Sequence, residues 1–254
     1  MTFSAPAIPD ISQPELSTRL QQKLDNKTKP LGSLGRIEAL AQRIGLILGT
    51  ETPALESPQL VVFAADHGLA ARGVSAYPSD VTWQMVENFL SGGAAVSVLA
   101  RQHGIGLTVV DCGVRHDFAP RAGLLDCKIA AGTADALEGP AMTEVQCEQA
   151  LNNGAELLRN LPGNALLLGE MGIGNTSAAS LLMSRLAGLD IVDCTGAGTG
   201  LDAEAVQRKI GVLRQVLARH AHAQTPLQAL QAFGGFEIAT MVGAVLQAAH
   251  ERRV

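Results

Sequence analysis

The stretch ALLLGEMGIGNTSAAS, residues 165–180, joins an apolar run to a small-residue segment through a glycine-rich turn. The run at residues 165–168 has no alternation of apolar and polar residues, which predicts a strand buried on both faces. A helical segment is expected from residue 178 to 186. Strand, tight turn and helix in this order are the repeating unit of a parallel sheet, so the stretch predicts an α/β fold.

Four other short apolar runs have the same texture, and each ends in glycine or a polar turn. They are LVVFAADHG (60–68), LTVVDCGV (107–114), LDCKIAAGT (125–133) and DIVDCTGAGTG (190–200). Helical segments are expected at 81–90, 94–102, 143–158, 178–186 and 203–219. Strands that alternate with helices predict right-handed crossovers and therefore an open parallel sheet.

The first fifty residues have a different pattern. After a polar, proline-bearing arm, Leu16, Leu20 and Leu24 recur at helical spacing. A second helix is expected to begin at Ser33 as N-cap, and its apolar stripe comprises Ile37, Leu40, Ala41, Ile44 and Leu48. We therefore expect two units: residues 1–50 as an arm with the helices of a small domain, and residues 51–254 as the sheet domain.

Composition excludes several classes of partner. The formal net charge is −5 and the basic residues are dispersed, so the sequence offers no basic face for nucleic acid. The amino-terminus lacks the pattern of a signal peptide, and no apolar run approaches membrane-spanning length, which predicts a cytoplasmic protein without a membrane partner. The four cysteines have no C-x-x-C or zinc-ligand spacing, so we expect reduced thiols and no metal site.

Polar residues gather where the predicted strands end, which is where ligands collect in an open parallel sheet. In the opening turn, Gly172 and Gly174 free backbone N–H groups, while Asn175, Thr176 or Ser177 can cap the next helix. The positive end of that helix attracts a phosphate. The spacing matches neither a dinucleotide fingerprint nor a P-loop, so a purely structural turn stays open from this pattern alone.

Glu170 makes the turn informative, because a carboxylate repels a phosphate. If both are used, Glu170 contacts a sugar hydroxyl or a ring N–H, and the ligand carries phosphate together with such a donor. A second glycine stretch, TGAGTGLDAEAVQRKI (195–210), is expected to repeat the arrangement of strand, turn and helix. Its Lys209 is either a solvated surface lysine or a counter-charge for the phosphate.

Six segments together resemble a known family. They are KTKPLGSLGRIEALA (27–41), VVFAADHGLAARGVSAYPSDVTWQMVENFLSGGAAVSVLA (61–100), VVDCGV (109–114), GEMGIGNTSAAS (169–180), TGAGTGLDAEAVQRKI (195–210) and FGGFEIATMVGAVLQAA (233–249). In this order they resemble segments of the nicotinate-nucleotide:dimethylbenzimidazole phosphoribosyltransferases, which make the lower-ligand nucleotide of cobalamin. Each motif alone is modest, whereas six in order are highly specific.

The resemblance implies transfer of phosphoribose from nicotinate mononucleotide to 5,6-dimethylbenzimidazole, giving α-ribazole 5′-phosphate and nicotinate. It implies no metal and no organic cofactor, and a homodimer. The fold implied is a Rossmann-like three-layer α/β/α sandwich with an open parallel sheet, plus a small helical domain built from both chain ends.

Site residues follow from the matching motifs. By resemblance, Glu170 lies near the reacting groups as the catalytic residue, and the nucleotide and its phosphate are held by Gly172, Gly174, Asn175, Thr176 and Lys209. The wall of the benzimidazole pocket is implied to comprise Ser75, Tyr77 and Gln84. Asp66 and His67 are expected to shape the site, and Trp83 is expected to be a packing aromatic.

The family continues beyond the last residue of this sequence to an R-L-G-E-G segment, whose glutamate is assigned as the base, and the sequence here ends at AAHERRV. Three explanations are open: a fragment, a neighbouring chain that supplies the missing part, or Glu170 as a weaker base. The apolar face of the last predicted helix, at Ile238, Met241, Val242, Val245 and Leu246, favours a fragment.

Two other functions are alternatives. One is a catalytically weak or inactive homologue that binds the nucleotide without turning it over. The other is a different phosphoribosyl- or nucleotide-processing activity. Release of free nicotinate in the presence of both substrates separates the phosphoribosyltransferase from the binding protein.

Overall fold

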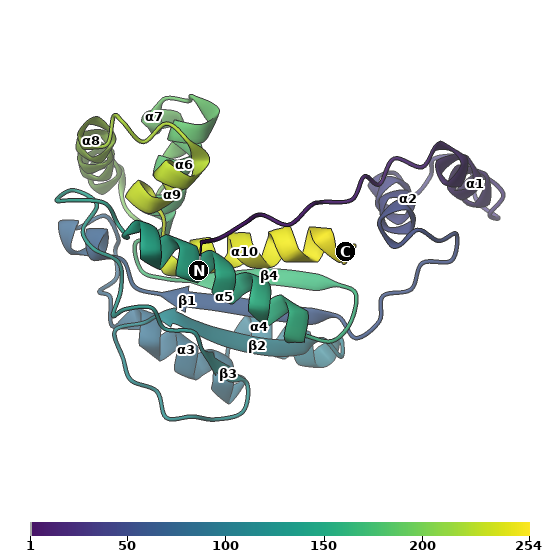
Figure 1. The fold of residues 1–254 in the computed structure, drawn as a ribbon, viewed down its shortest axis with the longest axis horizontal. Helices are drawn as coiled ribbons and strands as arrows, with labels where there is room; N and C mark the ends of the chain where they lie inside the picture. The colour runs from purple at the N-terminus through teal and green to yellow at the C-terminus, as the bar shows by residue number, and fades with distance from the viewer. Residues whose placement is uncertain (1) are drawn as a thin grey trace.

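The computed structural model describes residues 2–254, and within them a four-stranded parallel sheet forms the centre of the molecule (Figure 1). The strand order is β3-β2-β1-β4. The strands are β1 (Gln59–Ala65), β2 (Gly106–Gly113), β3 (Leu124–Asp126) and β4 (Leu166–Met171). The predicted α/β class with a parallel sheet is confirmed.

Side chains of the central strands alternate between two helical layers. Val61 and Phe63 of β1 face α5 (Glu144–Asn160) and α10 (Phe236–His250), which pack against each other on one face of the sheet (Figure 1). Val62 of β1 lies in the opposite core, with α3 (Val81–Ser91) and α4 (Ala95–Gln102). Because successive strand residues point to opposite faces, buried residues on both sides give the expected three-layer arrangement.

A third helical group lies at the carboxyl end of the sheet. It contains α6 (Asn175–Ala187), α7 (Ile191–Cys194), α8 (Ala203–Arg219) and α9 (Pro226–Phe233) (Figure 1). Leu181, Leu213 and Phe233 are buried together in its core. This core packs α8 against α6, and Lys209 of α8 thereby contacts Thr176 in the first turn of α6.

The amino-terminal helices α1 (Pro14–Asp25) and α2 (Arg36–Leu48) pair with each other away from the sheet (Figure 1). The segment that precedes α1 runs beside α10, where His250 Nδ1 lies 2.7 Å from the carbonyl oxygen of Ala7. Leu16, Leu20 and Leu24 are buried on α1, as the helical spacing predicts.

Two expectations for α2 are wrong. Its N-cap is Gly35 rather than Ser33. In the expected apolar stripe, Ile37 and Leu40 are exposed, and the helix instead buries Glu38 and Gly45. Glu38 pairs with Lys29 at 2.8 Å, an ion pair that the apolar pattern of the helix does not reveal.

The stretch 190–200 is not a strand, contrary to expectation. Asp190 caps the short helix α7, because its side chain accepts a hydrogen bond from the N–H of Val192 at 2.9 Å. The chain from 195 to 202 is irregular before α8 begins at Ala203. In the stretch 125–133, only residues 125 and 126 belong to a strand.

Strand β4 is also less buried than predicted. Leu167 and Leu168 are 38% and 42% exposed, because β4 is the edge strand of the sheet within the described residues. At its start, Val254 forms two backbone hydrogen bonds with this strand region, to Asn164 and from Leu166, each 2.8 Å long. Among residues 2–254, we find no helix long and apolar enough to cross a membrane.

Candidate functional site

The turn after β4 is held against the end of β1. A side chain at Gly172 would strike the carbonyl oxygen of Ala65 and lie 3.3 Å from the imidazole of His67. Gly174 has a left-handed backbone with φ +98° and is the N-cap of α6. Only glycine fits both requirements without strain or displacement. The turn is therefore built to bring backbone close to the strand ends.

Helix α6 begins at Asn175, three residues earlier than the sequence suggests. The expectation that Asn175, Thr176 or Ser177 caps this helix is wrong, because Gly174 occupies that position and no side chain caps it. The first turn of α6 therefore presents its positive end toward the small cavity lined by Gly172, Gly174, Asn175 and Thr176.

Glu170 is fixed across this turn. Its Oε2 accepts a hydrogen bond from Asn175 Nδ2, which ties the end of β4 to the first residue of α6. Although Glu170 keeps an exposed face, partial burial raises the pKa of this carboxyl, and the negative charge of Glu237 adds to the effect while His67 opposes it. A carboxylate whose pKa is raised is a better proton acceptor near neutral pH.

Lys209 is buried, with 1% of its surface exposed, so the interpretation as a solvated lysine is wrong. Helix α8 carries it inward, and the start of that helix is fixed by Asp202, which accepts a hydrogen bond from the N–H of Ala205 at 2.8 Å. Lys209 Nζ donates to Thr176 Oγ1 at 2.9 Å. Burial lowers the pKa of Lys209.

No carboxylate among residues 2–254 forms an ion pair with Lys209 at 4.0 Å or less. A buried ammonium without a counter-ion is costly unless an anion joins it. Gly198 of the second glycine stretch lies beside this group, since a side chain there would be 3.8 Å from Nζ. The two glycine stretches therefore meet at Lys209 and Thr176.

A second polar group lies behind the turn, at the end of β1. His67 Nε2 is 2.7 Å from Glu237 Oε1, and both side chains are buried. Burial opposes a charge on His67, but the negative charge and hydrogen bond of Glu237, helped by Asp66 and Glu170, raise the pKa of the ring above its usual value. Asp66 Oδ2 accepts a hydrogen bond from the N–H of Arg115 at 2.8 Å.

The residues expected to wall the benzimidazole pocket lie at the margin of this site. Ser75 lines the small cavity of the turn and its hydroxyl accepts a hydrogen bond from the N–H of Tyr77 at 3.3 Å. Tyr77 is 51% exposed, and Gln84 is exposed on α3. Trp83 stacks on His116, with ring centroids 4.7 Å apart, as a packing aromatic would.

Two buried residues of the site were not singled out from the sequence. Thr82 of α3 is fully buried, and its hydroxyl accepts a hydrogen bond from the N–H of Ile173 at 3.1 Å, which anchors the turn from the other layer. Glu237 lies in the first turn of α10. The sequence contained a signal for it, because Glu237 is an acidic residue at the start of an apolar helix, and that helix begins directly after two glycines.

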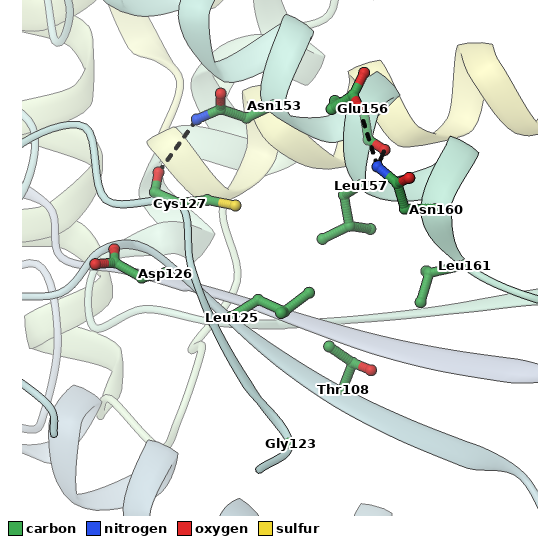
Figure 2. Close-up of a pocket in the computed structure, with 10 residues that line it drawn as sticks. All are labelled: Thr108, Gly123, Leu125, Asp126, Cys127, Asn153, Glu156, Leu157, Asn160 and Leu161. Atoms are coloured by element: carbon green, nitrogen blue, oxygen red, sulfur yellow. Dashed lines mark hydrogen bonds between the residues drawn. The ribbon is translucent and has the colours of Figure 1, made fainter. Parts of the chain in front are cut away.

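A much larger cavity lies elsewhere. It measures about 500 Å³ and opens between α5 and strands β2 and β3 (Figure 2). Leu125, Leu157 and Leu161 supply apolar walls, while Asn153 donates to the carbonyl of Cys127 at 3.3 Å. None of the predicted site residues lines it. The turn instead borders a cavity of about 20 Å³, which is lined by Ser75, Gly172, Gly174, Asn175 and Thr176 among others.

These features indicate the general class of protein to which the chain belongs. A buried lysine, glycine turns and a helix N-terminus at the carboxyl end of a parallel sheet are typical of proteins that bind phosphorylated ligands. A family model described as phosphoribosyltransferase matches residues 10–254.

Similar proteins of known name identify the family within this class. The chain is 73% identical to the nicotinate-nucleotide–dimethylbenzimidazole phosphoribosyltransferase of Variovorax paradoxus (strain S110), over 98% of this chain and 71% of that protein. It is 56% identical to the protein of the same name from Dechloromonas aromatica (strain RCB), over 96% and 73%. It superposes on the crystal structure of CobT from Thermus thermophilus with a TM-score of 0.90 and 39% identity, covering 94% of this chain and 73% of that one. The chain belongs to the nicotinate-nucleotide–dimethylbenzimidazole phosphoribosyltransferase family.

Proposed function

We propose that this chain transfers phosphoribose from nicotinate mononucleotide to 5,6-dimethylbenzimidazole, giving α-ribazole 5′-phosphate and nicotinate. The observation that carries the proposal is the buried Lys209 ammonium, which has no carboxylate partner among the described residues and lies beside the turn that bears Glu170. Phosphate and ribose are the two parts of a nucleotide that this combination suits. Family membership supplies the identity of the reaction.

The nucleotide is held by the turn and the lysine. The phosphate lies against the backbone of Gly172 and Gly174 and the first turn of α6, and Lys209 neutralises its charge. Thr176 positions the lysine through its hydroxyl. Asn175 contributes by fixing Glu170, which keeps the carboxylate next to the ribose rather than the phosphate.

Glu170 serves the reacting groups. Nicotinate leaves from a pyridinium nitrogen and departs as a neutral ring, so the departure needs no general acid. The acceptor must be placed opposite the leaving group, and its ring N–H proton must be removed. The raised pKa of Glu170 brings its basicity toward that task, while its negative charge stabilises a ribose with oxocarbenium character.

The acceptor binds at the edge of the site, against Ser75, Tyr77 and Gln84. The exposed phenol ring of Tyr77 offers an apolar face to a flat aromatic ring, and Ser75 borders the cavity of the turn. Asp66 and His67 shape the floor of the site from the end of β1.

The active form that we propose is a homodimer in the cytoplasm, with residues 1–50 as the small domain. An exposed apolar surface on α2 and the segment before it is suited to contact another protein chain. It comprises Leu31, Leu34, Ile37 and Leu40. The four cysteines are free, which suits a reducing compartment. Sedimentation velocity measures the oligomeric state directly.

The decisive experiment measures free nicotinate by chromatography after incubation of the purified chain with both substrates. We expect turnover, and a kcat about 100-fold lower in Glu170→Gln, because removal of a positioned base costs that much or more. Glu15→Gln, an exposed glutamate on α1, is the control and keeps full activity. Nucleotide binding without nicotinate release in the unmodified chain would favour the non-catalytic homologue.

A further inference from the structure

The ring of His67 occupies the junction of three segments. It follows β1, and the glycines of the β4 turn lie on it, because a side chain at Gly172 would come within 3.3 Å of Nε2. From the other side, a side chain at Gly235 would lie 2.5 Å from Cε1 and collide with the carboxylate of Glu237. The absence of side chains at these two positions lets the ring touch both the turn and the start of α10.

The charges around this ring are predominantly negative. Glu237 from α10, Asp66 from the end of β1 and Glu170 from β4 all act on His67. Cys112 of β2 also faces Glu237, but burial raises the pKa of this thiol well above its usual range, so the thiol is neutral. Two buried carboxylate oxygens, Asp66 Oδ1 and Glu237 Oε2, have no hydrogen-bond partner among the described residues. Buried negative charge of this kind requires a positive neighbour, and the imidazole is the group in contact.

Resting on the function proposed above, we propose that the buried His67–Glu237 pair is a positioning device, in which Glu237 keeps an imidazolium behind the turn and that imidazolium limits how far the buried carboxylate of Glu237 hinders ionisation of Glu170. Neither residue touches a substrate in this scheme. Glu237 keeps the ring charged, and the ring offsets part of the repulsion that Glu237 exerts on Glu170. The contact of the ring with Gly172 couples this charge to the geometry of the turn.

The test is the pH dependence of kcat/KM for the full chain and for His67→Asn. Glu170 must be deprotonated to accept a proton, so its ionisation sets the acidic limb of the profile. Loss of the imidazolium makes deprotonation harder, and we expect the limb to move upward by about one pH unit. An unmoved limb in a folded His67→Asn protein would overturn the inference.

Two controls separate this effect from loss of structure and from failure of the proposed function. Thr240→Val removes a buried hydroxyl one turn further along α10, which donates a hydrogen bond to the carbonyl of Phe236 at 2.7 Å. It should lower the melting temperature without moving the limb. Glu170→Gln should abolish the limb. If the limb persists in Glu170→Gln, the role of Glu170 itself is wrong, and the inference falls with it.

A measurement on the unmodified chain covers the case in which His67→Asn does not fold. Nitrogen-15 NMR of the histidine rings reports the protonation of His67 directly. We expect a doubly protonated ring at pH 7, and a neutral ring at that pH in Glu237→Gln, because the two largest effects that favour the charge both come from Glu237, while burial opposes the charge. A neutral His67 at pH 7 in the unmodified chain would also overturn the inference.

Discussion

The two glycine-rich stretches look alike in the sequence but differ in the fold. Residues 172–174 form a buried turn between strand β4 and helix α6, whereas residues 195–200 form a loop that is exposed from Gly196 onward and follows the short helix α7. At Gly172 an added side chain would meet backbone and the His67 ring, while at Gly196 it would meet nothing within 4 Å. The glycine at 172 is therefore required for close packing, whereas space for a side chain is available at 196.

The difference indicates that the two glycine stretches have different roles around Lys209. The buried turn sets the positions of Glu170 and the start of α6, since it is fixed by Thr82, Asn175 and the end of β1. The exposed loop approaches the same lysine through Gly198. We therefore expect substitution of Gly172 in the first stretch to damage both stability and activity, and substitution of Gly196 in the second to act weakly or on ligand binding alone.

The largest expected effect is that of Gly172→Ala. The new methyl group would press on the carbonyl of Ala65, and overpacking of this kind costs about 1–3 kcal/mol of unfolding free energy. Displacement of Glu170 should lower kcat by about 100-fold, because positional errors near 1 Å have that effect. Thermal unfolding and nicotinate release measure the two losses.

Gly211→Ala is the matched control for this substitution. Gly211 is on α8, where an added methyl group meets nothing within 4 Å, so alanine should stabilise the helix by about 0.5–1 kcal/mol. Full activity and normal stability in Gly172→Ala would show that the turn is not tightly packed and would remove the contrast between the two stretches.

Lys209→Met tests the point where the stretches meet. Loss of a charge-assisted contact to phosphate should weaken nicotinate mononucleotide binding by about 10- to 100-fold. Stability without ligand should be unchanged or higher, since a buried cation without an ion-pair partner among the described residues is replaced by an apolar side chain of similar length. Calorimetric titration gives the affinity, and thermal unfolding without ligand gives the stability.

Arg208→Met supplies the neighbouring control, because Arg208 is exposed and pairs with Glu204 on the same helix. It should bind the nucleotide normally. Equal losses of affinity in both variants would mean that α8 acts through its overall charge rather than through the buried ammonium.

The sequence predicted what local patterns determine. The strands β1, β2 and β4 were recognised because short apolar runs end in polar turns, and α8 was predicted with its observed bounds of Ala203–Arg219 because Asp202 caps a strongly amphipathic segment. The run at residues 190–194 was misassigned, since a short apolar run fits a buried strand or a helical turn equally well. Only the packing of Ile191 against the α6–α9 core selects the helix.

The site was predictable where its residues adjoin a turn and unpredictable where they meet across the chain. Glu170, Gly172 and Gly174 belong to one short segment, so their proximity follows from the turn itself. His67 and Glu237 are 170 positions apart and pair only because α10 packs on the same sheet. Burial of Lys209 likewise depends on the contact of α8 with α6, which no local pattern contains.

The smallest expected effect is that of Gly196→Ala. This substitution tests whether the second glycine stretch is free of packing contacts in the protein without ligand. Its backbone lies outside the left-handed region, and an added methyl group meets nothing within 4 Å, so stability should change by no more than about 0.5 kcal/mol. Measured by thermal unfolding, a loss as large as that of Gly172→Ala would show that the loop is packed as tightly as the turn. An unchanged melting temperature with a raised KM would instead locate its contribution in the bound state, because a methyl group that is free of contacts in the empty protein can only be felt when the loop moves toward the ligand.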